Sequence, residues 1–321
     1  MRGAPWWTGD GRVVRADPAD RERLPRDTWD RAGLPAGVRL EFTAHGVSAV
    51  EVAYTASPPK GADAHRDAPA MFTLLAGEDA TDTPASPGEH RALIQLPSPD
   101  AEFTLHLPET LRPALHGVRP VDGTLTPAVR RPRWLVHGDS VAEGWSASRP
   151  HLAWPALAGR ALGVETVNLG YAGAARGELA SAEQLASLDA DLITLAFGTN
   201  CWSRVPHSAR LLYETVRAFL DLVRRGHPST PLLVVSPVVR PDAEAVPNVL
   251  GATLRDLRTA VERAALDART ELLPGGELLD AGHLVDGVHP GDAGHRVLAE
   301  AVASAVRKGY GTGCQPRAAS S

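Results

Sequence analysis

The hydrophobic pattern of the chain changes at about residue 130. Before that point, apolar and polar residues alternate in short runs, as half-buried strands require. The runs cover residues 38–42, 50–54, 71–75, 93–96 and 103–107, and Pro- and Gly-containing breaks separate them. No helical periodicity of useful length appears in this part. Short strands with frequent turns predict a β-sandwich, of jelly-roll type, over residues 1–130.

From residue 131 the pattern becomes that of strands alternating with helices. Continuous apolar runs at residues 134–136, 192–197 and 232–235 are typical of strands covered on both faces. Apolar residues at helical spacing mark three helices, by Leu212, Val216, Phe219, Leu220 and Val223, by Leu250, Leu254, Leu257 and Val261, and by Leu298, Ala301, Val302 and Ala305. This alternation predicts an α/β domain with a parallel sheet over residues 131–310, followed by a flexible tail over 311–321.

Composition and charge narrow the functional classes. The 321 residues are 43% hydrophobic and 22% charged, which is ordinary for a globular protein of two domains. The net charge of −5 is spread without a basic stripe, so we expect no nucleic-acid partner. No stretch approaches the roughly 20 apolar residues of a membrane span, and no signal-peptide core is seen. We therefore expect a cytoplasmic protein with no membrane partner; the oligomeric state stays open.

A candidate nucleophile follows the first strand of the α/β part. Gly138-Asp139-Ser140 comes directly after the apolar run 134–136. In open α/β sheets, ligands bind beyond the carboxyl ends of the strands, where this serine is expected to lie. Taken alone, the tripeptide favours an ordinary turn. A serine hydroxyl becomes a useful nucleophile only if a base removes its proton.

A candidate base lies near the other end of the chain. In Asp286-Gly287-Val288-His289-Pro290, an Asp three residues before a His can reach the second imidazole nitrogen and stabilise the imidazolium. The alternative is an Asp-Gly turn before a helix that starts with proline. The twelve histidines show no paired-ligand spacing for a metal, and Cys201 and Cys314 make neither a disulfide framework nor a zinc site. We expect no cofactor.

Two further blocks offer donors for an oxyanion. Asn168-Leu169-Gly170-Tyr171-Ala172-Gly173 and Gly198-Thr199-Asn200 end the second and third strands. A glycine N–H and an asparagine side-chain amide are suitable uncharged donors. The alternatives are a turn of positive φ for Gly173 and a helix cap for Asn200.

The four blocks, in this order and each after the appropriate strand, resemble those of the SGNH hydrolase superfamily, also called GDSL esterases. The resemblance covers about residues 132 to 307 and implies a flavodoxin-like three-layer fold. It also implies Ser140 as nucleophile, His289 as general base and then acid, and Asp286 as its partner. The implied oxyanion hole consists of the Ser140 and Gly173 N–H groups and the Asn200 side chain.

The chain departs from the family pattern at two positions. Val141 replaces the usual Leu of the first block, and Cys201 replaces the last Asp of the third, which puts the support of Asn200 in doubt. We expect Cys201 to be a small buried side chain near the site rather than a nucleophile. Trp145, Trp154 and Trp202 are candidates to line an acyl or acceptor pocket together with Cys201; packing in the core is the alternative for each tryptophan.

A β-sandwich before an SGNH domain resembles the arrangement of family 2 carbohydrate esterases and of a salicylyl acyltransferase of tetracycline biosynthesis with its relatives. The leading hypothesis is a serine-dependent acyl-ester hydrolase that acts on a small glycoside or natural-product ester. A first alternative is an acyltransferase that passes the acyl group to an alcohol or amine. A second is an inactive carbohydrate-binding protein whose sandwich does the binding.

Overall fold

The computed structural model describes residues 1–59 and 68–310, and the tail expected over residues 311–321 lies outside these ranges. The strands of the N-terminal part are β1 (Trp6–Trp7), β2 (Val13–Val14), β3 (Arg39–His45), β4 (Ala49–Ser57), β5 (Met71–Ala76), β6 (Asp79–Pro84), β7 (Gly88–Gln95), β8 (Ala101–His106), β9 (Arg112–Val121) and β10 (Thr124–Pro127). Those that follow are β11 (Arg133–Gly138), β12 (Glu165–Gly170), β13 (Leu192–Ala196), β14 (Leu232–Val235) and β15 (Glu271–Leu273).

The helices lie mainly in the second half of the chain. The α-helices are α1 (Arg26–Ala32), α2 (Ser140–Glu143), α3 (Trp154–Leu162), α4 (Leu179–Ser187), α5 (Asn200–Ser203), α6 (Ala209–Gly226), α7 (Leu254–Asp267) and α8 (Asp292–Tyr310). Short 3-10 turns cover Pro18–Asp20, Pro150–Leu152 and Ala281–His283.

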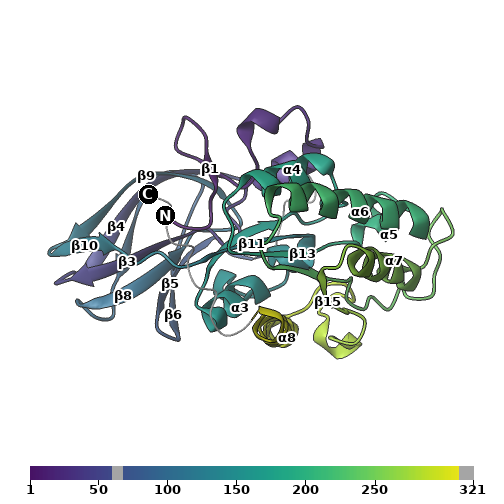
Figure 1. Ribbon diagram of the computed structural model, residues 1–321. Coiled ribbons are helices and arrows are strands. Elements are labelled where there is room, and N and C mark those ends of the chain that lie inside the picture. Colours follow the sequence, from purple (N-terminus) through teal and green to yellow (C-terminus); the bar gives the residue numbers. More distant parts are fainter. Residues whose placement is uncertain (60–67, 311–321) are drawn as a thin grey trace.

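Two antiparallel sheets make up the N-terminal β-sandwich (Figure 1), which confirms the prediction from the alternating pattern. One sheet has the order β10-β3-β8-β5-β6, and the other has the order β7-β4-β9. Aromatic side chains fill the layer between them: Phe42 and Phe103, neighbours in one sheet, have rings 5.7 Å apart, and Tyr54 of the other sheet meets Phe72 edge-on at 5.2 Å. Burying a side chain of this size contributes about 1.5–3 kcal/mol.

The second half forms a three-layer α/β unit around a parallel sheet of order β12-β11-β13-β14-β15. Numbered along the chain this order is 2-1-3-4-5, the flavodoxin-like arrangement. Helices α4, α6 and α7 cover one face of the sheet, and α3 and α8 cover the other (Figure 1). The predicted fold class is therefore confirmed.

The long helices begin where the sequence supplies a cap. The Ser208 side chain accepts a hydrogen bond from the Leu211 N–H at the start of α6. Thr253 and Asp256 form a capping box that begins α7 at Leu254. Leu250, expected on the buried face of this helix, lies before the cap in an exposed loop, so that expectation was wrong.

The register of the parallel sheet places three strand ends side by side. Gly138, the last residue of β11, pairs with Gly170 of β12 on one side and with Ala196 of β13 on the other. A Cβ atom at Gly138 would lie 2.2 Å from the Ala196 carbonyl oxygen, so only glycine fits. The segments that follow these strands consequently start at one level of the sheet edge.

Part of the segment before β3, from Arg15 to Ala32, packs on the α/β unit, whereas Val13 belongs to the sandwich core. Ala16, Leu24 and Ala32 belong to the hydrophobic cluster beneath α4 and α6. The fully buried Arg15 guanidinium donates hydrogen bonds to the carbonyl groups of Asn168 and Gly170 in β12. A division of the chain at residue 130 stays a prediction, but these contacts tie residues 15–32 to the second half.

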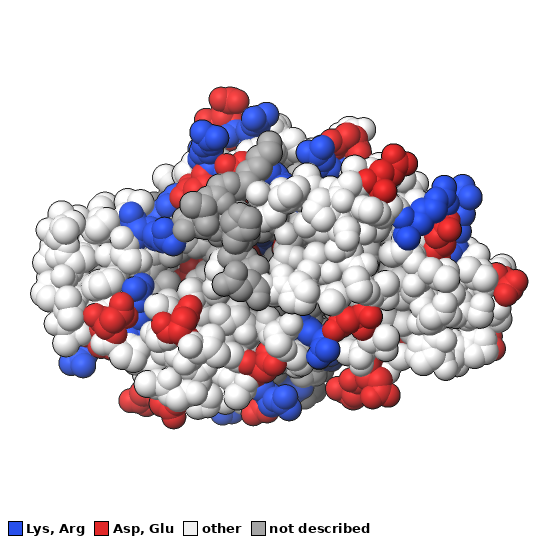
Figure 2. All heavy atoms as spheres, turned by 180° about the vertical axis from the view of Figure 1, so that it is seen from behind, with Lys and Arg blue, Asp and Glu red and all other residues white. Residues whose placement is uncertain are grey.

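The surface carries mixed charge. On the face shown in Figure 2, acidic and basic side chains are interspersed between wide uncharged areas. Within residues 1–59 and 68–310, no helix combines the length and apolar character that crossing a membrane requires.

His137 in β11 makes stability depend on pH. Its ring is buried, stacks on Phe219 at 5.2 Å, and burial lowers its pKa to about 4. In the unfolded chain the His137 imidazole is half protonated near pH 6.5, whereas in the folded chain it is half protonated only near pH 4. The contribution of neutral His137 to the free energy of unfolding is therefore fully present above pH 6.5 and is lost as the pH falls toward 4. We expect His137 to account for about 2 kcal/mol of lost unfolding free energy between pH 8 and pH 5.

Urea unfolding at pH 8 and pH 5 measures this loss. The matched variant is His137→Phe, which keeps a stacked ring and cannot titrate. The variant should lose about 2 kcal/mol less unfolding free energy between pH 8 and pH 5 than the native protein does. An equal loss in both proteins would contradict the assignment.

Candidate active site

Ser140 lies at the first position of the short helix α2, directly beyond the end of β11. Asp139 precedes it as the N-cap, and the Asp139 carboxylate accepts the Val141 N–H at 3.1 Å. The backbone N–H groups of Gly198 and Thr199 also favour the charged form of Asp139. Complete burial outweighs these interactions and raises the pKa of Asp139 to about 7. This side chain thus ties the serine turn to the loop that follows β13.

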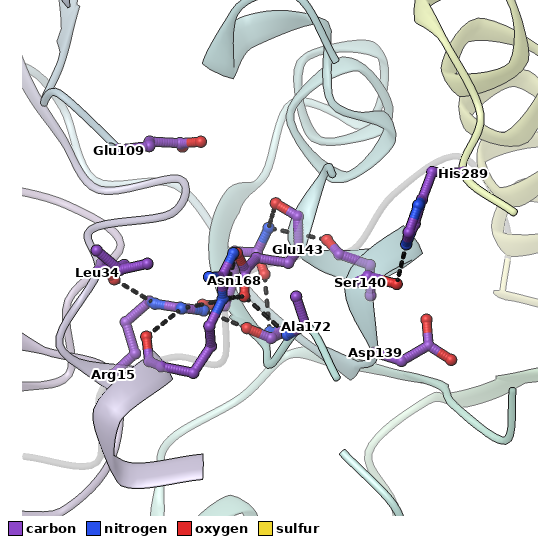
Figure 3. Close-up of polar contacts among 12 residues, drawn as sticks. Arg15, Leu34, Glu109, Asp139, Ser140, Glu143, Asn168, Ala172 and His289 are labelled. Atoms are coloured by element: carbon purple, nitrogen blue, oxygen red, sulfur yellow. Dashed lines mark hydrogen bonds and ion pairs between the residues drawn. The ribbon is translucent and has the colours of Figure 1, made fainter. Parts of the chain in front are cut away.

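Ser140, His289 and Asp286 form a hydrogen-bonded series (Figure 3). His289 Nε2 lies 2.9 Å from Ser140 Oγ, and His289 Nδ1 lies 2.7 Å from Asp286 Oδ2. The other oxygen of Asp286 accepts the N–H groups of Val288 and His289, at 2.9 and 2.7 Å. The three-residue spacing predicted this reach, and the structure places the imidazole between the serine and the carboxylate.

The charge on Asp286 is favoured by its hydrogen bonds. Partial burial raises the pKa of Asp286, but the bonds from the His289 ring and from two backbone N–H groups outweigh this effect and lower it. An ionised Asp286 accepts the Nδ1–H of the ring, which leaves the Nε2 lone pair toward the Ser140 hydroxyl. The arrangement can therefore remove a proton from Ser140.

Three candidate donors lie next to the serine. The Ser140 N–H is at the start of a helix, where no intrahelical acceptor exists. Gly173 has a φ of +71°, which favours glycine and turns the peptide after β12 toward the site. One N–H of the Asn200 amide donates to the Ala175 carbonyl at 3.2 Å, so the group has a second N–H to offer. Both sequence interpretations of Gly173, a turn and a donor, are compatible with this geometry.

These residues line one pocket of about 340 Å³. Its walls include Ser140, Gly173, Asn200, His289 and Trp145. The Trp145 ring lies 5.6 Å from the His289 ring. The same pocket is bordered by Arg204 and Arg240. Arg240 is held by the Asp242 carboxylate, at 2.8 and 2.9 Å, and lies over the Trp202 ring.

Trp145 is the one candidate pocket residue from the sequence that lines this pocket. Trp154 is buried in the core, with its ring 6.0 Å from that of Trp134. Cys201 is fully buried in the cluster under α6, as a small apolar side chain would be. Trp202 lies behind Arg240 and donates its Nε1–H to the Val246 carbonyl. The pocket assignment of these three residues is corrected accordingly, because α3 and α5 turn them toward the protein interior or the neighbouring loop.

Sequence reasoning missed the charged groups behind the site. Glu143 ends α2 and is buried, and Arg15 and Arg31 of the N-terminal segment reach it. The local signal was weak: a Glu three residues after the candidate nucleophile is unremarkable in a helix. Its arginine partners lie more than 100 positions earlier in the chain.

Cys201 should be chemically inert in the folded protein. Burial raises the pKa of its thiol far above the ordinary value, and the reactive species is the thiolate. We expect iodoacetamide to leave Cys201 unmodified at pH 8 until urea unfolds the chain, as read by peptide mass spectrometry. Cys201→Ala should retain the fold and the turnover of the native protein within about twofold. Rapid labelling of Cys201 in the native protein would contradict this expectation.

Solved structures similar to this one share both of its parts. The salicylyl-acyltransferase SsfX3 from a tetracycline biosynthetic pathway superposes with a TM-score of 0.85 and 26% identity, over 97% of this chain and 95% of that one. A candidate GDSL-like lipase from Bacteroides ovatus gives 0.76 and 21%, over 92% and 91% of the two chains. A family two carbohydrate esterase from Clostridium thermocellum gives 0.66 and 13%, over 85% and 92%; these last two establish the fold alone.

Sequence comparison assigns the family. No curated protein matches the chain. Residues 136–297, half of the chain, match the GDSL-like lipase/acylhydrolase family, and this range contains Ser140, Asn200 and His289. The protein is therefore an enzyme that belongs to the GDSL-like lipase/acylhydrolase family.

Proposed function

We propose that this protein is a serine-dependent acyl-ester hydrolase that works through an acyl-enzyme on Ser140. The observation that carries the proposal is the unbroken hydrogen-bonded series from Ser140 through His289 to Asp286, beside three candidate oxyanion donors. A serine nucleophile needs a base within hydrogen-bond reach, and the base needs a partner that fixes its tautomer.

In the first half of the reaction, Ser140 Oγ attacks the carbonyl carbon of the ester while His289 Nε2 takes the hydroxyl proton. The carbonyl oxygen becomes an oxyanion, which the N–H groups of Ser140 and Gly173 and the Asn200 amide stabilise. The bond from the carbonyl carbon to the leaving oxygen then breaks, and His289 returns its proton to the alcohol. Ser140 is left as an acyl ester.

In the second half, water attacks the acyl-enzyme. His289 Nε2 takes a proton from the water, and the same three donors hold the second oxyanion. The bond to Ser140 Oγ breaks, the serine recovers its proton from His289, and the carboxylic acid leaves. Asp286 stabilises the imidazolium in both halves without accepting its proton.

The pocket supports a small ester as substrate. A volume of about 340 Å³ lies at the lower end of the range for small-molecule sites. Trp145 offers an apolar wall, whereas Arg204 and Arg240 offer hydrogen-bond donors at the border. An acylated small glycoside or a natural-product ester combines such apolar and polar parts.

A second candidate is acyl transfer to an alcohol or amine acceptor. The similarity to a salicylyl-acyltransferase over 97% of the chain, sandwich included, favours it. The chemistry up to the acyl-enzyme is identical, so the outcome depends on whether water or the acceptor attacks. Mass spectrometry of the products, with p-nitrophenyl esters as donors and a panel of alcohols and amines present, separates the two candidates: free acid supports hydrolysis and acylated acceptor supports transfer.

Ser140→Ala tests the shared first half. We expect kcat for p-nitrophenyl acetate to fall by about 10⁴-fold or more, because the nucleophile is lost while the binding pocket stays. The native protein should also label at Ser140 with a fluorophosphonate, as intact mass will show. Ser181→Ala, at another buried serine, is the control and should retain full turnover. Undiminished turnover by a folded Ser140→Ala protein, or no labelling of the native one, rules out the proposal and favours an inactive binding protein.

Asn200→Ala tests the oxyanion donor. Removing one such donor costs about 10²–10³ in kcat, or about 3–4 kcal/mol, with little effect on KM, because the bond strengthens only as charge develops. Steady-state kinetics on p-nitrophenyl acetate measures both constants, and circular dichroism checks that the loss of the bond to Ala175 leaves the fold intact. A rise in KM at constant kcat would instead indicate a substrate-binding residue.

A further inference from the structure

A buried ion cluster behind the serine turn joins the N-terminal segment to the site. Glu143 at the end of α2 accepts hydrogen bonds from Arg31 Nε at 2.8 and 3.0 Å, and Arg31 Nη2 also bonds to it. Arg15 Nη2 lies 3.5 Å from the same carboxylate. All three side chains are at least 96% buried. Figure 3 shows Glu143 between Arg15 and Ser140.

Glu143 also holds the loop that carries a proposed oxyanion donor. Its Oε2 atom accepts the Ala172 N–H at 2.9 Å. The Ala172 N–H belongs to the Tyr171–Ala172 peptide unit, so this bond holds the peptide unit directly before the one that carries the Gly173 N–H. A donor is effective only if it is already aimed at the developing charge. Glu143 is therefore placed to keep the Gly173 N–H in position.

Arg31 reaches the proposed base by a second route. Its guanidinium carbon lies 4.8 Å from the centre of the Trp145 ring, and this ring lies 5.6 Å from the His289 ring. The Trp145 carbonyl accepts a hydrogen bond from His295 of α8, which secures the tryptophan backbone. The planar guanidinium thus contacts the carboxylate edge-on and the indole face-on, two contacts that one ammonium group cannot make together.

A gain in folding stability alone does not explain why these charged groups are buried. Buried charged groups lose their hydration, and packed apolar side chains of the same volume often stabilise a fold as well or better. The Arg15 and Arg31 cations exceed the one Glu143 carboxylate, so carbonyl groups such as those of Leu34 and Gly170 must hold the excess charge. The position of the cluster, between the donor loop and the base, calls for another explanation.

We propose that Arg31, supplied by helix α1 from outside the family-matched range, is a positioning residue of the active site. Through Glu143 it holds the Tyr171–Ala172 peptide, directly before the Gly173 N–H, and through Trp145 it supports the His289 ring. The inference rests on the proposed function, since it assigns the residue that aligns the same serine, base and oxyanion donor. Residues 15–32 are, in this view, part of the catalytic unit.

The test compares Arg31→Met and Arg31→Lys with the native full-length protein. Arg31→Met keeps the unbranched apolar stem of the side chain and removes the guanidinium, and Arg31→Lys keeps the charge but loses the two-pronged, planar contact. We expect kcat for p-nitrophenyl acetate to fall about 10- to 100-fold in Arg31→Met, less than for loss of a whole donor, with KM within about threefold. Arg31→Lys should recover part of this loss. Pre-steady-state rates should fall for both acylation and deacylation, because both pass through an oxyanion.

Arg39→Met is the matched control. Arg39 is also buried, pairs with Glu41 at 2.7 Å and reaches from the sandwich to the Thr166 carbonyl in β12, but its partners are remote from Ser140. Its removal should lower the melting temperature and leave kcat within about twofold. Kinetics are measured well below each melting temperature, so a merely structural role of Arg31 would leave kcat unchanged. If Arg31→Met does not fold, Arg31→Lys decides.

The outcomes separate the inference from the function on which it rests. Native turnover that depends on Ser140, combined with native kcat in folded Arg31 variants, overturns the inference alone. Absence of any Ser140-dependent turnover or fluorophosphonate labelling in the native protein overturns both. A fall in kcat in the Arg39 control equal to that in Arg31→Met also overturns the inference, because the effect would then be one of general stability.

Discussion

The close packing of three strand ends is the constraint on which the rest of the site depends. Gly138 pairs with Gly170 on one side and with Ala196 on the other, and no larger residue fits at Gly138. Gly170 is similarly confined, since a Cβ there would lie 2.4 Å from the Glu143 backbone nitrogen. Because these strands end at one level and in contact, the turns after them can share a single small volume. Ser140, Gly173 and Asn200 come together for this reason.

Hydrogen bonds between the turns convert this proximity into a defined geometry. The Asp139 N–H donates to the Ala196 carbonyl at 3.2 Å, which joins the serine turn to the end of β13, before the Asn200 turn. The Asn168 amide donates to the Ala142 carbonyl at 3.0 Å, and its oxygen accepts the Gly170 N–H, which joins α2 to β12. Residues with no proposed chemical role, Asp139 and Asn168, therefore hold the turns that carry the candidate oxyanion donors.

The electrostatics of the site are divided into two regions. On the solvent side, Asp286 is ionised and orients His289, while Arg204 and Arg240 border the pocket. Behind the serine turn, Glu143 is neutralised by Arg31 and Arg15. The two arginines of the second region come from the N-terminal segment, whereas the proposed reacting groups all lie after residue 138. This ion cluster holds the segment before the sandwich against the α/β unit.

The sequence alone determined the two-part architecture and the three residues that form the hydrogen-bonded series. Alternation and continuous apolar runs depend on which faces of a strand are buried, and such patterns are local. Asp286 and His289 were identifiable because a three-residue loop spacing limits how far apart their side chains can be. The family resemblance then supplied Gly173 and Asn200, although each of these alone is equally typical of a turn or a cap.

Only the tertiary structure decided which side chains face the pocket and which support it. Cys201 and Trp154 were plausible wall residues, but side-chain direction in α5 and α3 depends on the packing of distant helices, and both are buried. Leu250 fitted a helical spacing, but the capping box after it began the helix later. The contact of Arg31 with Glu143 spans 112 positions and leaves no periodic or motif signal. Such a contact arises when two folded surfaces meet, and this is why the sequence pointed to the proposed reacting groups but not to the buried ion cluster behind them.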